Sequence, residues 1–323
     1  MTLREFTSRL NDWGHNHVPF LFITDFELKS PLAFTLDEID KSSMLYCLNG
    51  VTNSSPATTN GRPPSIKKLP INVEDYASMF NSVQYHLHYG DTFLTNLTIR
   101  TKIELSTTLK DLFNVSRANY KLWMKDQFLV FSPETFVKIR EGRIYSFPMK
   151  GTIDASIPGA EDIILNNKKE LAEHVTIVDL IRNDLSMVST NVKVARFRYL
   201  EEVRTNHKNL LQVSSEIVGD LPSDYKSHLG DILLSLLPAG SVSGAPKEKT
   251  LEIIRKAEGA DRKYFTGVFG FFDGHQLDSG VMIRYIEQDG PDFYYRSGGG
   301  ITAQSEVTSE FNEAIDKVYV PVN

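Results

Sequence analysis

Cysteine is almost absent from this sequence of 323 residues, and Cys47 alone excludes a disulfide within the chain. No run of 18 apolar residues could cross a membrane, and residues 1–13 lack the apolar core of a secretion signal. Basic residues form no block and number 35 against 41 acidic ones, a net charge of −6. Because binding to nucleic acid depends on concentrated positive charge, we expect no nucleic acid partner. The missing apolar segments lead us to expect a cytoplasmic protein without a membrane partner.

The residues that are present suit a large folded protein. Apolar residues make up 41% of the chain and charged residues 24%, which is the balance of a globular protein with enough material for a sizeable core. Segments typical of strands and of helices come in blocks and do not alternate strictly. That order favours the α+β class, in which antiparallel sheets are covered by helices.

Periodicity and capping residues predict the individual elements. Asn72 suits the start of a helix and Gly90 its end. The predicted helices cover residues 71–89, 108–125, 168–187, 224–237, 248–258 and 306–318. The predicted strands cover residues 18–26, 44–48, 92–104, 127–131, 135–140, 143–147, 192–204, 210–218, 265–272, 276–287 and 292–297. Residues 49–70 are rich in Asn, Ser, Thr, Pro and Gly, and we expect a mobile loop there.

Two glutamate pairs are the first candidates for chemistry. Glu170 and Glu173 lie three residues apart in one predicted helix, and Glu310 and Glu313 repeat this spacing in another, so each pair shares a helix face. Such a pair is usually a solvated surface, but both pairs continue into apolar stripes, where a carboxylate is costly without a cation. With no His or Cys cluster nearby, four carboxylates suit a hard cation, and we expect Mg²⁺.

Glycine-rich segments and one arginine suggest an anion site. Residues 240–244 and 298–300 are each expected to precede a helix, where free backbone amides favour a phosphate or carboxylate. Neither segment has the spacing of a nucleotide-binding loop, and ordinary turns are the alternative. Arg284 follows an apolar strand segment, so it is a candidate clamp for a carboxylate or an arginine paired within the protein.

A lysine and a further glutamate complete the candidates. Lys150 follows Pro148 at an expected strand end, where it is either a solvated turn residue or a nucleophile whose pKa is lowered by desolvation. Glu134, at the start of another predicted strand, is a candidate general acid or base. The residues themselves thus indicate an enzyme that binds a small carboxylate together with Mg²⁺.

Seven segments occur in a characteristic order: SPETF (132–136), PMKGT (148–152), KELAEHVTIVDLIRNDL (169–185), PAGSVSGAPK (238–247), FTGVFGFFDG (265–274), VMIR (281–284) and SGGGITAQSEVTSEFNEAIDK (297–317). Together they resemble the chorismate-utilising enzymes, the family of anthranilate, isochorismate, salicylate and aminodeoxychorismate synthases. The resemblance implies the fold of that family, largely antiparallel sheets packed as a sandwich and covered by helices. It also implies a single chorismate-binding domain over residues 1–323, with a shortened N-terminal part (1–70) and a catalytic core (71–323).

The resemblance also implies roles for individual residues. Glu173 and Glu313 look like direct ligands of Mg²⁺, supported by Glu170 and Glu310. Glu134 looks like the acid or base. The residues that the resemblance assigns to binding chorismate are Thr152, Ser243, Arg284, Gly298, Gly300 and Lys317.

Position 150 discriminates among the members of the family. Anthranilate and isochorismate synthases typically carry alanine there, whereas aminodeoxychorismate synthase component I carries lysine. The resemblance therefore implies that Lys150 attacks C2 of chorismate while the C4 hydroxyl leaves with help from Glu134, and that ammonia then adds at C4. Leu94 stands where isochorismate and salicylate synthases have a lysine that activates water, so direct attack by water is not expected.

The implied product is 4-amino-4-deoxychorismate, a precursor of para-aminobenzoate and folate. Ammonia is expected from glutamine through a partner amidotransferase, because this chain carries no Cys-His glutaminase signature. Gln212 and Phe265 depart from the histidine and the tyrosine or tryptophan of many relatives. Anthranilate synthase component I is the alternative within the family, and a non-catalytic binding module with the same fold is the alternative outside it.

Overall fold

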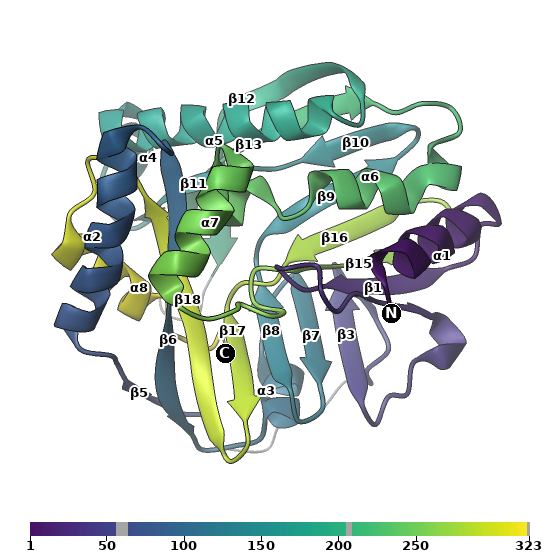
Figure 1. The fold of residues 1–323 in the computed structure, drawn as a ribbon, viewed down its shortest axis with the longest axis horizontal. Helices are drawn as coiled ribbons and strands as arrows, with labels where there is room; N and C mark the ends of the chain where they lie inside the picture. The colour runs from purple at the N-terminus through teal and green to yellow at the C-terminus, as the bar shows by residue number, and fades with distance from the viewer. Residues whose placement is uncertain (56–63, 205–208, 322–323) are drawn as a thin grey trace.

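Two antiparallel sheets form the frame of the computed structural model, which describes residues 1–55, 64–204 and 209–321 (Figure 1). The first sheet has the order β11 (Met149–Asp154), β13 (Asn209–Asp220), β10 (Arg143–Ser146), β9 (Thr135–Arg140), β16 (Leu277–Val281), β15 (Val268–Phe272), β1 (Phe20–Thr24) and β2 (Leu32–Thr35), and β12 (Thr190–Arg204) pairs with β13. The second has the order β14 (Gly244–Ala245), β6 (Leu94–Leu105), β18 (Asp292–Ile301), β17 (Tyr285–Asp289), β8 (Phe128–Ser132), β7 (Tyr120–Met124), β3 (Met44–Leu48) and β4 (Val51–Thr52), and β5 (Ile66–Leu69) pairs with β6.

The helices lie on the outer faces of this frame (Figure 1). Their bounds are α1 (Leu3–His15), α2 (Val73–Tyr89), α3 (Leu109–Val115), α4 (Ala160–Asn166), α5 (Lys168–Ser186), α6 (Leu229–Leu236), α7 (Lys247–Glu258) and α8 (Val307–Asp316). Short 3₁₀ turns occur at Leu36–Glu38, Tyr225–His228 and Gly240–Val242. Helices α1, α5 and α6 pack on the first sheet, whereas α2, α7 and α8 pack on the second.

The two sheets meet through a buried apolar layer. Leu21 of β1 and Phe269 of β15 pack in one cluster with Leu122 of β7 and Val130 of β8, and all four side chains are almost completely inaccessible to solvent. Because residues of one face of a strand alternate with those of the other, each sheet can bury this face and still pack helices on its opposite side. The prediction of an α+β fold with packed antiparallel sheets is confirmed.

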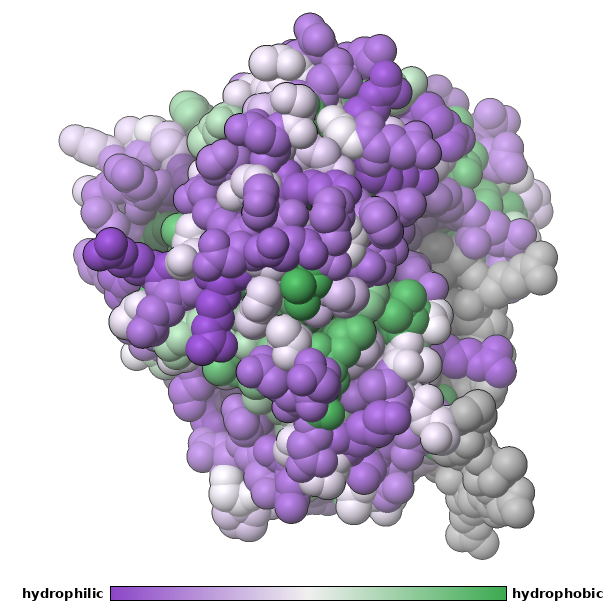
Figure 2. Space-filling model, turned by 90° about the vertical axis from the view of Figure 1, so that its right-hand side faces the viewer, coloured by the Kyte–Doolittle hydropathy of each residue, from purple (hydrophilic) through white to green (hydrophobic). Residues whose placement is uncertain are grey.

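The face of the molecule that carries α1 is mostly hydrophilic and has one limited apolar area (Figure 2). Within the described residues, no helix is both long enough and apolar enough to span a membrane. Strands β1 and β3 come from the first 70 residues and pair with β15 and β7, so the N-terminal part contributes to both sheets.

Several predicted elements were wrong. Residues 108–125 do not form one helix, because α3 ends at Val115 and the aromatic segment Tyr120–Met124 pairs as a strand with β3 and β8. Residues 148–152 are not a turn but enter β11. The stretch 298–300 is the end of strand β18 and not a loop. Within 49–70, β4 and β5 are strands, and the expectation for residues 56–63 lies outside the described residues.

Candidate active site

A cavity of about 1210 Å³ opens where β11 and α5 face β18 and α8. Strand β11 supplies its floor, and the glycine-rich strand β18 supplies the opposite wall. The volume exceeds that of most small-ligand pockets, so a small ligand can enter with water or a second reactant. Nearly all candidates from the sequence line this cavity: Glu134, Lys150, Thr152, Glu170, Glu173, Arg284, Gly298, Gly300, Glu310, Glu313 and Lys317.

Lys150 lies on β11 and points at helix α5. Its Nζ is 2.7 Å from Oε2 of Glu173, and its side chain retains 33% of its exposure. Burial acts to lower the pKa of the Lys150 ammonium, but pairing with Glu173 and the charges of Glu313 and Glu170 outweigh burial, so the pKa lies above its ordinary value. The expected neutral, desolvated amine is therefore wrong for this state, in which the lysine is protonated and ion-paired.

The four glutamates come from two helices that face one another across Lys150. Asn167 begins α5 by accepting the amide of Glu170, which fixes the first helical turn and directs Glu170 and Glu173 toward β11. On α8, Glu310 is only 7% exposed, and burial, together with the charge of Glu313, raises its pKa above the ordinary value. Glu313 instead pairs with Lys317, 2.6 Å away.

The donor chemistry of this cluster fits a hard divalent cation. All four side chains present carboxylate oxygens to one cavity, and Glu310 has no ion pair with any described residue, although it is buried. A buried carboxylate of this kind is stabilised by a cation. Within the described part of the chain, no three acidic or His and Cys side chains converge closely enough to form a ready-made metal centre. Lysines hold Glu173 and Glu313 instead, so a metal would have to compete with them.

The glycine segment 298–300 forms the wall opposite Lys150. It pairs with residues 96–98 of β6, so Gly298 and Gly300 lie in a strand and not at a helix start. Asn96 and Gly298 direct their backbone hydrogen bonds away from this pairing, to Ser243 and Arg262 and to Lys317, so the amides of both glycines point away from β6. The expectation that these amides bind a carboxylate stays a prediction. A Cβ atom on Gly299 would lie 3.4 Å from Nζ of Lys317 and 3.6 Å from Oε1 of Glu313. Lys317 also donates to the carbonyl of Gly298, at 2.9 Å. The wall is therefore backbone, and the absence of side chains keeps the cavity open.

Two cationic side chains, Arg284 and Lys317, lie at the far end of the cavity. Arg284 lies between β16 and β17, not within an edge strand, and it has no acidic partner within 4.0 Å in the described residues. Burial acts to lower the pKa of Arg284, but the neighbouring Tyr295 and Tyr319 outweigh this effect, so the pKa lies above its ordinary value. Burial lowers the pKa of Lys317, an effect that Glu313 opposes. A guanidinium and an ammonium beside one another suit a ligand with more than one carboxylate.

Glu134 faces the glycine-rich loop at the same end. Removal from water raises the pKa of its carboxyl group, while a hydrogen bond from Ser241 and the charges of Arg284 and Lys317 oppose the rise. Oγ of Ser241 donates to Oε1 of Glu134 at 2.5 Å. A carboxyl group with a raised pKa that still reaches a cavity can hold a proton for transfer.

Ser243 does not line the cavity, and its assignment to substrate binding is wrong. Its side chain is completely buried, and Oγ donates to the carbonyl of Ala239 at 2.9 Å, which stabilises the loop itself. Ser241, two residues earlier, is the serine that reaches the cavity, and the sequence analysis missed it. Both serines lie in the same motif, so the motif located the loop but could not show which hydroxyl points inward.

Asp184, which the sequence analysis did not single out, lines the site together with four residues that it did: Thr152, Gln212, Leu94 and Phe265. Asp184, near the end of α5, pairs with Lys247 at 3.2 Å and lies against Gly240, so it holds both ends of the glycine-rich loop. Burial raises the pKa of Asp184 above its ordinary value. Thr152 and Gln212 sit opposite one another on β11 and β13 and both line the cavity. Leu94 and Phe265 complete the lining there.

Comparisons with known proteins agree with this architecture. The family described as chorismate binding enzyme matches residues 27–323. A PabA-like protein of Haemophilus influenzae, named as uncharacterized, is 44% identical over 321 residues, which are 99% of this chain and 98% of that protein. Aminodeoxychorismate synthase component 1 of Klebsiella aerogenes is 29% identical over 312 residues, covering 92% of this chain and 67% of that one.

A solved structure has the same fold. A 2,3-dihydroxybenzoate-specific isochorismate synthase, DhbC from Bacillus anthracis, superposes with a TM-score of 0.74 at 19% identity, covering 98% of this chain and 87% of that one. At that identity the likeness concerns the fold alone. The matched family extends over the candidate site, from Glu134 to Lys317. The chain belongs to the chorismate binding enzyme family.

Proposed function

We propose that this protein catalyses the Mg²⁺-dependent replacement of the C4 hydroxyl group of chorismate by an amino group. The product would be 4-amino-4-deoxychorismate, as for an aminodeoxychorismate synthase. One observation carries the proposal: the amine of Lys150 lies on the cavity floor, 2.7 Å from Glu173 and within the field of four carboxylates. The relative from Klebsiella aerogenes, which bears the name of that enzyme, supports it.

Binding would use both ends of the cavity. Arg284 and Lys317 would hold one carboxylate of chorismate beside the strand that carries Gly298 and Gly300, and Thr152 would contact the ring from the floor. Glu173 and Glu313 would bind Mg²⁺, and Glu170 and Glu310 would support them. When bound, the cation would neutralise substrate carboxylates that otherwise repel these glutamates.

Two covalent steps would replace the C4 hydroxyl group by an amino group, through a temporary bond between Lys150 and C2. The ammonium of Lys150 first loses a proton to water, and its neutral amine forms a bond to C2 while the ring double bond shifts and the C4 hydroxyl leaves as water after taking a proton from Glu134. Ammonia then forms a bond to C4 and gives one proton to Glu134, the double bond shifts back, and Lys150 leaves C2 as a neutral amine. Chorismate and ammonia thus give 4-amino-4-deoxychorismate and water, and the enolpyruvyl group stays in place.

Ammonia would come from glutamine through a partner amidotransferase, and free ammonium would replace it in the test tube. The product would supply para-aminobenzoate for folate, which is a cytoplasmic role. A downstream lyase would be needed to release pyruvate, because the proposed chemistry leaves the enolpyruvyl group untouched.

Product identification tests the proposal. The purified protein is incubated with chorismate, ammonium and MgCl₂, and products are analysed by mass spectrometry before and after addition of an aminodeoxychorismate lyase. We expect 4-amino-4-deoxychorismate first and 4-aminobenzoate after the lyase. Anthranilate with release of pyruvate would contradict the proposal in favour of anthranilate synthase. Binding of chorismate without any product would contradict it in favour of a non-catalytic module.

A further inference from the structure

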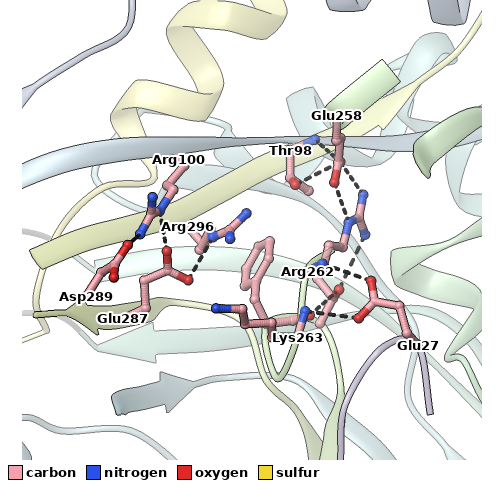
Figure 3. Close-up of polar contacts among 11 residues, drawn as sticks. Glu27, Thr98, Arg100, Glu258, Arg262, Lys263, Glu287, Asp289 and Arg296 are labelled. Carbon is pink, nitrogen blue, oxygen red and sulfur yellow. Dashed lines mark hydrogen bonds and ion pairs between the residues drawn. The ribbon is translucent and has the colours of Figure 1, made fainter. Parts of the chain in front are cut away.

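A buried ion pair lies behind the cavity, at the end of helix α7 (Figure 3). Arg262 is 1% exposed and donates to both oxygens of Glu258, at 2.6 and 2.9 Å. The ring of Phe26 covers the guanidinium, 4.6 Å away. Neither Glu258 nor Arg262 lines the cavity, so no direct contact with substrate is available to them.

The remaining hydrogen bonds of this pair go to separate segments of the cavity wall. Arg262 donates to the carbonyl of Val242 at 2.9 Å and to the carbonyl of Asn96 at 2.7 Å. Oε1 of Glu258 accepts both the amide and the hydroxyl of Thr98, each at 2.8 Å. Val242 belongs to the glycine-rich loop, whereas Asn96 and Thr98 belong to β6, and all three line the cavity. One ion pair therefore joins two walls that are far apart in the sequence.

The chain around Arg262 is itself held in place. Glu27 accepts the amides of Arg262 and Lys263, at 2.8 and 3.0 Å, so the turn after α7 cannot shift without breaking these bonds (Figure 3). Burying two charges is expensive, and an apolar pair of similar size is often at least as stable. Charged groups do, however, give strong and directional hydrogen bonds to carbonyls and amides. The arrangement thus suits precise placement of backbone better than it suits stability.

We infer that Arg262, together with Glu258, is a positioning residue for the reaction. It holds the carbonyl of Val242, and this fixes the preceding residue, Ser241, whose hydroxyl donates to Glu134. Asp184 and Lys247 hold the two ends of the loop, and β14 pairs with β6. Arg262 adds a side-chain restraint on the side of β6, at Val242 and Asn96. The inference rests on the proposed function only in taking Glu134 as the acid.

The test compares Arg262→Met with a matched control, Arg100→Met. Arg100 lies on β6, the strand to which Arg262 bonds, and pairs with Glu287 and with Asp289, but within the described residues it does not line the cavity and has no bond to the loop (Figure 3). We expect Arg262→Met to lower kcat for consumption of chorismate on the order of 10- to 100-fold, with KM changed less, since a displacement of about 1 Å in a catalytic group is that costly. Arg100→Met should keep wild-type kcat even if its melting temperature falls.

Two further readouts separate positioning from general loss of structure. If Ser241 moves away, the pKa of Glu134 loses a contact that lowers it, so the high-pH limb of kcat should move to higher pH in Arg262→Met and not in Arg100→Met. The double variant Glu258→Gln, Arg262→Met carries no unpaired buried charge, so it should fold and yet show the same loss of kcat. Arg262→Lys should recover part of the rate.

Amide hydrogen exchange provides a measurement that does not depend on turnover. Residues 239–245 and 96–98 should exchange at least tenfold faster in the double variant than in Arg100→Met. Unchanged exchange there, or a wild-type kcat and pH profile in the double variant, would overturn the inference. An unexpected product from the wild-type protein would contradict the proposed function instead, and the exchange result would still decide the role of Arg262.

Discussion

The hydroxyl of Ser241 donates to the carboxyl group of Glu134 across 2.5 Å, which joins the glycine-rich loop of residues 238–247 to the start of β9. The contact has an electrostatic consequence, because it opposes the effect of burial on the pKa of Glu134. The same bond orients the carboxyl group of Glu134 and therefore its proton. The geometry of proton transfer from Glu134 thus depends on a loop from another part of the chain.

The first prediction concerns pH. Burial raises the pKa of Glu134, so its acid form persists to higher pH, and activity that needs this proton falls as pH rises through the pKa. Ser241→Ala removes a contact that lowers the pKa, so the falling limb of kcat should move to higher pH. Glu134→Gln should lower kcat by roughly 10²- to 10⁴-fold and abolish this limb. The pH dependence of kcat for the three proteins provides the measurement, and an unmoved limb in Ser241→Ala would argue against the pairing.

The second prediction separates two roles of Lys150. Lys150→Arg keeps a cation beside Glu173 but cannot supply a neutral amine, since a guanidinium stays protonated. We expect it to fold like the wild type and to lose product formation as fully as Lys150→Ala does.

Mass spectrometry of the intact protein, after an acid quench in the absence of ammonium, should show an adduct of chorismate less one water in the wild type only. Turnover by Lys150→Arg at the wild-type rate would refute the role of Lys150 as nucleophile.

The third prediction concerns the buried glutamate of α8. In the protein without metal, Glu310 is a buried carboxylate beside Glu313, and Glu310→Gln should raise the free energy of unfolding by about 1 kcal/mol. The same change should weaken Mg²⁺ binding by roughly 10- to 100-fold. Chemical denaturation with and without MgCl₂ measures both effects. Glu306→Gln is a matched control, because Glu306 caps the same helix, is exposed and does not line the cavity. Equal responses of the two variants to Mg²⁺ would show that Glu310 has no part in the metal site.

The fourth prediction uses the glycine wall. A Cβ atom on Gly298 would lie 2.2 Å from the carbonyl oxygen of Leu97, which is backbone, so Gly298→Ala should destabilise the fold by about 1–3 kcal/mol or more. On Gly299 the new atom would meet the ends of three side chains, Lys317, Glu313 and Glu310, at 3.4, 3.6 and 3.7 Å. Gly299→Ala should keep the melting temperature and raise KM for chorismate. A comparison of thermal unfolding with KM tests this, and the reverse pattern would contradict the arrangement described for the wall.

Local signals in the sequence were enough to predict the long helices and the short buried strands. Helix α5 was predicted because an apolar period runs through residues 168–187, and α2 because Asn72 and Gly90 mark its ends. The helix predicted over 108–125 fails because packing between β3 and β8 selects the strand Tyr120–Met124, a choice made by distant residues. The strand character of residues 298–300 has the same origin, since β6 supplies the pairing.

The candidate site, too, was predictable from local sequence patterns in part, while other features of it depend on the fold. The spacing of the two glutamate pairs located two acidic helices correctly within the cavity lining. The protonated state of Lys150 could not be foreseen, since it depends on Glu173, which lies 23 positions further along the chain and 2.7 Å away in space. Ser243 and Ser241 show the limit of motif arguments, because the inward direction of a hydroxyl follows from the path of the loop.

The wall formed by Gly298, Gly299 and Gly300 bears on how this protein can change over evolution. A surface made of side chains can be reshaped by single substitutions, but a surface made of main chain offers nothing to exchange, and additions to it either clash with β6 or enter the cavity. New substrate preferences can therefore arise on the opposite side without disturbing this strand, because Thr152 and Gln212 present replaceable side chains there. A library aimed at altered specificity should vary that floor and leave the glycine strand untouched.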